Sequence, residues 1–119
     1  MKITKLVFLL GFVFLISSCV EAERKKITKN PGQLVYEKYN CKSCHTIGKG
    51  NLIGPDLKGI TQRREIEWLK KWILNPQKLI ESGDSLAINI YNEFEESPML
   101  SNDISESDME DLLEYLSEK

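Results

Sequence analysis

The sequence predicts an all-α domain, and two observations support this fold class. Apolar residues recur at intervals of three and four along residues 31–119, and capping residues or prolines stand where such segments would begin and end. Alternating runs of β-branched residues, which indicate half-buried strands, do not occur there. The chain has 119 residues, and the roughly 100 that follow its apolar leader suffice for one domain.

The N-terminal part of the domain predicts one helix followed by a long loop. We expect the helix over residues 31–40, because Pro31 suits the first position of a helix. Gly32 and Tyr36 would then lie four residues apart on one face. Residues 46–59 are rich in loop-forming residues and are expected to lack regular structure. These residues include Gly48, Gly50, Gly54 and Pro55.

The middle of the domain predicts a longer helix over residues 62–74, which has one apolar stripe. The stripe comprises Ile66, Leu69 and Ile73, flanked by Trp68 and Trp72. Asn75 and Pro76 would end this helix and start a short turn, because asparagine is a good cap and proline tolerates the first helical position.

Two more helices are expected toward the C-terminus. Asp84 is a suitable N-cap for the first, in which Leu86, Ile90 and Phe94 are in register. Ser97-Pro98-Met99-Leu100 then breaks the pattern. Ser105 would start the final helix, with Asp108 three residues later as a variant of the capping box. The apolar stripe of the final helix comprises Met109, Leu112, Leu113 and Leu116, with Tyr115 beside it.

The segment Cys41-Lys42-Ser43-Cys44-His45 carries the chemistry of this chain. The pattern C-x-x-C-H is the attachment signature of c-type haem. The two thiols add to the two vinyl groups of the porphyrin as thioethers, and the next residue, His45, can supply an axial nitrogen to the iron. His45 is also the only histidine in the sequence. The motif therefore predicts one covalently bound haem.

Other interpretations of this motif explain less. A structural zinc site normally needs four Cys or His ligands, and beyond the motif only Cys19 remains. A thioredoxin-type pair would be expected near a βαβ pattern, which the sequence does not show. A simple disulfide between Cys41 and Cys44 would leave His45 without a role.

The first residues predict an export signal rather than part of the fold. Two lysines precede an apolar run that ends at Ile16, and this run is too short for a membrane span of about 20 residues. Ile16-Ser17-Ser18-Cys19 resembles a bacterial lipobox, in which cleavage leaves the cysteine as a lipidated N-terminus. We therefore expect a lipoprotein signal peptide over residues 1–18 and lipidation at Cys19. The alternatives are ordinary cleavage after Ala22 and an uncleaved anchor.

Residues 19–30 are mostly polar and are expected to form a flexible tether to the membrane. The functional domain would then cover residues 31–119. Export agrees with the motif, because haem c is attached after export. The expected location is the periplasmic or cell-surface side of a bacterial membrane.

These motifs together resemble the small class I cytochromes c, the soluble or tethered monohaem domains of bacteria. Gly32-x-x-x-Tyr36 followed by the C-x-x-C-H segment is similar to the opening helix and haem site of the family. Gly54-Pro55-Asp56-Leu57 is similar to the loop that follows. Pro98-Met99 before a last helix with Glu114-Tyr115-Leu116 resembles the loop of the sixth ligand and the closing helix.

The resemblance implies a role for individual residues. His45 would be the proximal ligand of the iron and Met99 the distal one, with the Pro55 carbonyl accepting a hydrogen bond from His45. Met99 is also favoured by elimination, since Met1 leaves with the leader and Met109 falls on an apolar stripe; the alternative is a loop methionine that fills a gap. The family often places proline after the ligand methionine, whereas here Pro98 precedes Met99.

Two further roles follow from the resemblance. Gly32 would allow the first and last helices to cross closely, against Leu112 or Tyr115. Either Trp68 or Trp72 would bond a haem propionate through its indole N–H, with plain core packing as the alternative.

The implied function is electron transfer, not enzyme catalysis. A His–Met pair fills both axial positions and leaves no open iron site for a substrate. The expected partners are respiratory redox proteins, and the domain is expected to be a monomer. A haem peroxidase or gas sensor, in which Met99 leaves the iron, is the alternative, and a fixed relay subunit of a respiratory complex is a third. The net charge of −2 and the export signal argue against nucleic-acid binding.

Overall fold

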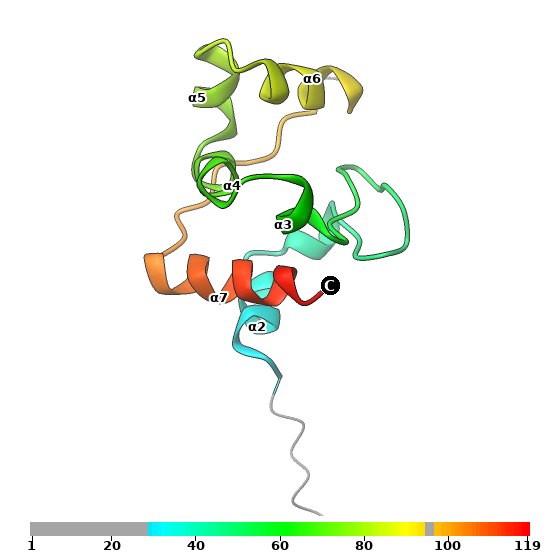
Figure 1. Ribbon diagram of the computed structural model, residues 1–119, viewed down its shortest axis with the longest axis vertical. Coiled ribbons are helices and arrows are strands. Elements are labelled where there is room, and N and C mark those ends of the chain that lie inside the picture. The colour runs from blue at the N-terminus through cyan, green and yellow to red at the C-terminus, as the bar shows by residue number, and fades with distance from the viewer. Residues whose placement is uncertain (1–28, 95–96) are drawn as a thin grey trace, which may run out of the picture.

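The computed structural model describes residues 29–94 and 97–119, and within them all regular structure is helical (Figure 1). The elements in chain order are α2 (Pro31–Lys38), η1 (Cys41–Ser43), α3 (Ile60–Arg63), α4 (Ile66–Leu74), α5 (Pro76–Glu81), α6 (Ser85–Glu93) and α7 (Glu106–Ser117). The predicted all-α class is therefore confirmed. The predicted signal peptide over residues 1–18, the predicted lipidation site Cys19 and nearly all of the predicted tether lie outside the described residues. Among the helices that are described, none is long and apolar enough to cross a membrane.

Helices α2 and α7 cross at Gly32, and Figure 1 shows them in contact. A Cβ atom added to Gly32 would overlap with the carbonyl oxygen of Asp111 and the Cβ of Tyr115. Only glycine permits this approach. The predicted close crossing is confirmed, and of the two residues expected opposite Gly32, Leu112 or Tyr115, it is Tyr115 that lies there. A second tie joins the helices, because the Asp108 carboxylate accepts hydrogen bonds from Lys38 Nζ at 2.6 Å and from the Tyr39 hydroxyl at 2.9 Å.

The hydrophobic core lies between these two helices and α3 and α4. The predicted stripe of α7 is confirmed, since Met109, Leu112, Leu113 and Leu116 are all buried. They pack with Val35, Tyr36, Ile60, Leu69, Ile73 and Ile104 in one cluster. The core therefore covers one side of the space in which the functional side chains gather.

The prediction of a single helix over residues 62–74 is wrong, because the structure has two helices, α3 and α4, in this part of the chain. Arg64 adopts an extended conformation (φ −141°, ψ 145°) and separates α3 from α4. The chain bends at this point, so that Ile60 is buried where α3 contacts α7, and tertiary packing overrides the helical period. Of the predicted stripe, Leu69 and Ile73 are buried in α4, whereas Ile66 at its start is 39% exposed and Trp72 is buried at 9% exposure.

Helix α2 ends two residues earlier than predicted. Tyr39 is its C-cap, and Asn40 has a positive φ of 55°, a left-handed conformation that asparagine tolerates better than most residues. The left-handed conformation of Asn40 changes the direction of the chain between α2 and η1, and Cys41 is the first residue of η1.

The predicted caps of the later helices are present, with one difference. The Asn75 side chain accepts from the backbone N–H of Lys78, and Asp84 accepts from that of Ala87. Ser105 accepts from the backbone N–H of Asp108, as one half of a capping box would require. The other half does not form, because the Asp108 carboxylate binds Lys38 and Tyr39 instead. The buried residue of α6 is Ala87, whereas the predicted set of Leu86, Ile90 and Phe94 is only half-buried.

Candidate haem site

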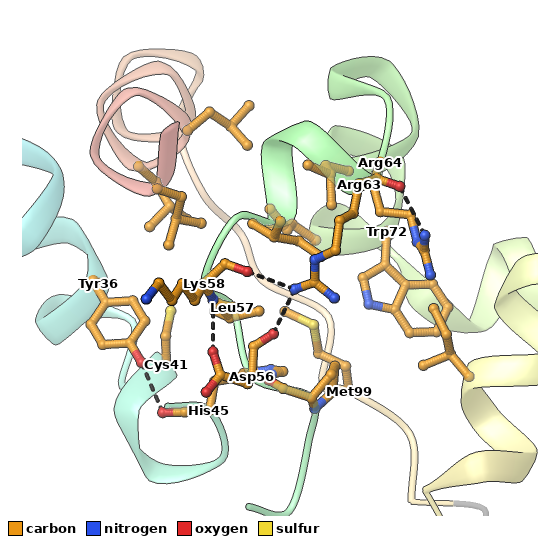
Figure 2. A pocket seen from close by; sticks show the side chains of 18 of the residues that line it. Tyr36, Cys41, His45, Asp56, Leu57, Lys58, Arg63, Arg64, Trp72 and Met99 are labelled. Carbon is orange, nitrogen blue, oxygen red and sulfur yellow. Dashed lines mark hydrogen bonds between the residues drawn. The ribbon is translucent and has the colours of Figure 1, made fainter. Parts of the chain in front are cut away.

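Two adjoining cavities occupy the space beside the core, with volumes of about 690 Å³ and 220 Å³. Both are lined by residues from distant parts of the chain, including Cys41, His45, Pro55, Trp72 and Met99. Figure 2 shows Tyr36 and Cys41 on one side of this space, and Arg63, Arg64 and Trp72 on the other. The fold therefore gathers most of the site residues that the sequence predicted.

The short helix η1 sets the spacing of the two cysteines. The backbone N–H groups of Cys44 and His45 both donate to the Cys41 carbonyl, at 3.2 and 3.0 Å. Both thiols are free; Cys41 lines both cavities and Cys44 lines the smaller one. Burial raises the pKa of the Cys41 thiol. Two thiols are thus held one turn apart on the wall of the cavity, next to His45.

The ring of His45 is fixed through one of its nitrogens. Nδ1 lies 2.8 Å from the carbonyl oxygen of Pro55, which can only accept, so Nδ1 carries the proton. Burial lowers the pKa of His45 and keeps the imidazole neutral. Nε2 is then left with a lone pair, which is the form in which histidine binds a metal.

Gly54 lets the following loop pass directly over this ring. A Cβ atom at Gly54 would lie 2.6 Å from Cε1 of His45, closer than real Cβ contacts allow. The backbone N–H of Gly54 also donates to the Cys44 carbonyl at 2.8 Å. Gly54 and Pro55 together clamp the imidazole from the loop side.

Asp56 organises the same loop, a role that sequence reasoning missed. Its carboxylate accepts from the backbone N–H groups of Gly48, Gly50 and Lys58, at 2.8, 2.6 and 2.7 Å, and from the Thr46 hydroxyl at 3.0 Å. These bonds, those from Gly48 and Lys58 first, hold the pKa of Asp56 well below its usual range. The available signal was an aspartate that follows a loop with several glycines.

Tyr36 supports the same segment from α2. Its hydroxyl donates to the His45 carbonyl at 2.8 Å (Figure 2). Burial, with a smaller effect from Cys41, raises the pKa of Tyr36 to about 12, so the hydroxyl remains a donor at neutral pH. The backbone of His45 is thus held from α2 and its side chain from the loop.

Met99 reaches the cavities from the segment between α6 and α7. It is half-buried and lines both cavities, whereas Met109 is 4% exposed within the core and lines neither. The Asn102 side chain donates to the carbonyls of Leu100 at 3.0 Å and Ile73 at 3.5 Å, and so ties this segment to α4.

Two neighbouring arginines on the opposite wall differ in their hydrogen bonds. One nitrogen of Arg63 donates to the carbonyls of Asp56 and Lys58, each at 2.9 Å. Arg64 also lines the larger cavity, and its buried Nε atom has no hydrogen-bond partner among the described residues. A buried N–H without an acceptor is costly, so the Arg64 side chain is suited to an anionic group.

The two tryptophans also differ. They stack at 5.3 Å between ring centroids, but the Trp68 indole N–H donates to Asp84 at 3.3 Å. Trp72 is the one that lines both cavities.

The residues of this site fit a haem. A cavity of about 690 Å³ with many apolar side chains in its lining suits the ring, and the free thiols of Cys41 and Cys44 suit its two vinyl groups. His45 and Met99 would be the residues to offer a nitrogen and a thioether sulfur to its iron. The cationic side chain of Arg64, which lines the larger cavity, suits a ring carboxylate.

Solved structures that resemble this chain are cytochromes c. A cytochrome c from Rhodothermus marinus has 27% identity over 74% of this chain and 72% of its own, with a TM-score of 0.65. The cytochrome c domain of the pp3183 protein from Pseudomonas putida has 27% identity, covers 73% of this chain and 85% of its own, and has a TM-score of 0.64. An engineered R. marinus cytochrome c bound to a carbene intermediate has 27% identity, coverages of 75% and 76%, and a TM-score of 0.62.

Among curated proteins no sequence matches. The family model described as Cytochrome c matches residues 30–118, which is most of the chain and all of the helical domain. The chain therefore belongs to the cytochrome c family, carries covalently bound haem c and transfers electrons through it.

Proposed function

We propose that this domain carries single electrons between respiratory proteins, with His45 and Met99 as the two axial ligands of its haem. When bound, the haem supplies an iron that changes between the ferrous and ferric states. The protein supplies the ligands, the apolar surroundings and the charges that set the reduction potential.

The observation that carries this proposal is the convergence of His45 and Met99 on one space. They come from segments more than 50 residues apart, and both line both cavities. The Pro55 carbonyl fixes the His45 ring with Nε2 available for the iron. Met109, the other methionine of the domain, is engaged in the core.

Two protein ligands favour electron transfer over catalysis. With both axial positions filled, a substrate has no direct access to the iron. A thioether ligand favours the ferrous state and raises the potential relative to two histidines. For the haem carboxylates, Arg64 and Trp72 are the proposed donors, since Trp68 is bonded to Asp84.

Spectroscopy of the purified protein tests the ligation. The oxidised form should be low-spin and show the weak red band of sulfur-to-ferric-iron charge transfer, and the reduced form should not bind carbon monoxide. A high-spin resting spectrum with rapid carbon monoxide binding would favour the peroxidase or gas-sensor alternative.

The proposed location is the outer side of the cytoplasmic membrane, with a lipid anchor at Cys19. The lipobox-like sequence supports this, and a tether of about ten residues would keep the domain near the bilayer. Wild-type protein should partition into detergent, and Cys19→Ser should not mature as a lipoprotein. A lipid-free mature N-terminus at Glu23 would instead support ordinary signal cleavage.

A further inference from the structure

Trp68 and Trp72 form a stacked pair that leads away from the haem site. They are the only tryptophans in the sequence and lie one helical turn apart on α4. Their ring centroids are 5.3 Å apart and their planes differ by 12°, which is an offset stack of two indoles. Trp72 is buried and lines both cavities, whereas Trp68 is half-buried and lines only the larger one. The pair therefore runs from the cavity wall toward the partly exposed Trp68.

A carboxylate lies at the Trp68 end of the pair. The indole N–H of Trp68 donates to Oδ1 of Asp84 at 3.3 Å. The same oxygen accepts from the backbone N–H of Ala87 at 2.8 Å, because Asp84 is the N-cap of α6. An indole N–H can only donate, and an ionised carboxylate can only accept. Asp84 is thus in position to take the indole proton of Trp68.

Packing alone explains part of this arrangement. A stacked aromatic pair adds about 0.5–1.5 kcal/mol beyond the burial of its surface, and a buried indole N–H usually finds an acceptor. A phenylalanine and a leucine at the same spacing would also pack together, but they have no redox chemistry. Indole gives up one electron more readily than most side chains, and the loss of that electron makes its N–H strongly acidic. The pair on α4 combines both requirements of such an oxidation, a route for the electron from the haem site and a proton acceptor at its end.

Tyr39 is a competing site for an oxidation of this kind. It lines both cavities, and its hydroxyl donates to the Asp108 carboxylate at 2.9 Å. That carboxylate also accepts from Lys38 Nζ at 2.6 Å, and this bond lowers the pKa of Asp108. A carboxylate held in an ion pair is a poor proton acceptor. The tryptophan pair, whose acceptor Asp84 binds two neutral N–H groups, is therefore the better route.

We propose that Trp72 and Trp68 carry oxidising equivalents away from the haem when a peroxide reaches its iron, and that Asp84 accepts the proton that Trp68 releases. This activity goes beyond the proposed electron transport, because it needs an open axial position and consumes peroxide. It moves the oxidation from the haem site to a side chain that an external reductant can reach.

The reaction starts from the reduced protein and hydrogen peroxide. Peroxide accepts one electron from ferrous iron, one electron from Trp72 and two protons from solvent, so that its O–O bond breaks and two water molecules form. Trp68 then gives an electron to Trp72 and passes its Nε1 proton to Oδ1 of Asp84. The products are ferric iron, a neutral Trp68 radical and a protonated Asp84. A one-electron donor such as ascorbate restores Trp68, and Asp84 returns the proton.

The test mixes the reduced, haem-loaded protein with an equal amount of hydrogen peroxide and records electron paramagnetic resonance spectra after freeze-quenching. All variants are made in Met99→Ala protein, so that the result does not depend on whether Met99 is an iron ligand. Trp68→Phe removes the indole and keeps an aromatic ring. Asp84→Asn removes the proton acceptor and keeps a good N-cap for α6. Tyr39→Phe is the control for the competing site.

We expect a neutral tryptophanyl radical in the Met99→Ala protein and its loss in the Trp68→Phe variant. Peroxide should bleach the haem absorbance severalfold faster in Trp68→Phe, because the oxidation then stays at the site. Asp84→Asn should give a tryptophan cation radical in place of the neutral one, since an amide does not take the proton. Tyr39→Phe should behave like the Met99→Ala protein. Peptide mass spectrometry after excess peroxide should find oxidation at Trp68.

Three results would contradict the proposal. A tyrosyl radical that disappears in Tyr39→Phe would assign the route to Tyr39. The absence of a tryptophan radical, with equal bleaching in Trp68→Phe and its parent, would show that the stacked pair only packs. A neutral tryptophanyl radical in Asp84→Asn would refute the role of Asp84 as the proton acceptor.

Discussion

The two sides of the haem site are held in very different ways. On the His45 side, many hydrogen bonds hold residues 45–58 together. The Pro55 carbonyl accepts from the His45 ring, and the Tyr36 hydroxyl donates to the His45 backbone. The Asp56 carboxylate accepts from four donors in the loop. On the Met99 side, the described bonds of residues 97–104 are few, the Ser97 backbone N–H to Phe94 and the Asn102 side chain to Leu100 and Ile73.

This difference indicates how one site can hold its haem permanently and still allow one axial position of the iron to change. Attachment and the first ligand come from one short segment whose geometry is fixed by many hydrogen bonds. The proposed second ligand, Met99, lies in a segment with few described hydrogen bonds and an exposed Leu100, which is the kind of region that opens locally at low cost. Changes on the His45 side should therefore affect whether a haem is held, and changes on the Met99 side how its iron behaves.

The largest expected effect comes from the cysteines. Cys41→Ala or Cys44→Ala should weaken or abolish covalent attachment, whereas Met99→Ala should leave it intact. Haem staining after denaturing gels and intact mass would show this. Pigment that is extracted from the wild type by acid acetone would contradict the covalent assignment.

Gly54→Ala should be the most damaging change on the His45 side that leaves the cysteines in place. The new Cβ would lie 2.6 Å from Cε1 of His45, so either the ring or the loop must move. We expect poor loading with haem or a loss of the low-spin spectrum. Gly83→Ala is the control, because its φ of +82° costs an alanine about 1–2 kcal/mol, but the new Cβ would meet nothing within 4 Å among the described residues beyond its chain neighbours. If both variants had normal spectra, the proposed clamp on the His45 ring would be wrong.

Met99→Ala should keep the haem but change the iron. The red band should disappear, the potential should fall, and carbon monoxide should bind the reduced protein. Met109→Ala should lower the free energy of unfolding by about 2–5 kcal/mol through the loss of core packing, with a normal spectrum. The assignment of the ligand would fail if the band disappeared in Met109→Ala instead.

The same contrast explains what the sequence could predict. Features that depend on neighbours close in sequence were predicted correctly. They include the helix caps at Asn75, Asp84 and Ser105 and the buried stripe of α7. The break at Arg64 and the exposure of Ile66 depend on packing between distant helices, which periodicity does not record.

The Asp56 network shows the same limit at the site. Three of its four donors are backbone N–H groups, which every residue except proline has, so side-chain identity does not mark these three donors in advance. The difference between Arg63 and Arg64 could not be predicted either, because they are adjacent residues of the same type. Arg63 donates to the loop, whereas the Nε of Arg64 has no hydrogen-bond partner among the described residues.

Asp56→Asn should loosen the His45 side in a pH-dependent way. The folded-state pKa of Asp56 is lowered, so its carboxylate stabilises the fold above the unfolded value of about 3.9 and this contribution is lost as the pH falls. The variant should therefore melt at a lower temperature than wild type at pH 7, and the gap should narrow below about pH 4. Thermal melts between pH 3 and 7 would measure this, and a gap independent of pH would argue against the charge as the cause.

Asn102→Ala should give the smallest effect, and it tests the Met99 side most directly. The variant loses the bonds to Leu100 and Ile73, at a cost of about 1 kcal/mol in a half-exposed setting. If this cost falls on the local opening of residues 97–104, imidazole should replace Met99 on the ferric iron about fivefold faster. Asn51→Ala is the matched control, since the Asn51 side chain accepts one bond from the Asp56 backbone at 3.0 Å on the His45 side. Similar losses of stability in both variants, with faster imidazole binding only in Asn102→Ala, would show that the two sides open independently. Equal acceleration in both would mean that the site opens as one unit, and the contrast between its two sides would then have no functional consequence.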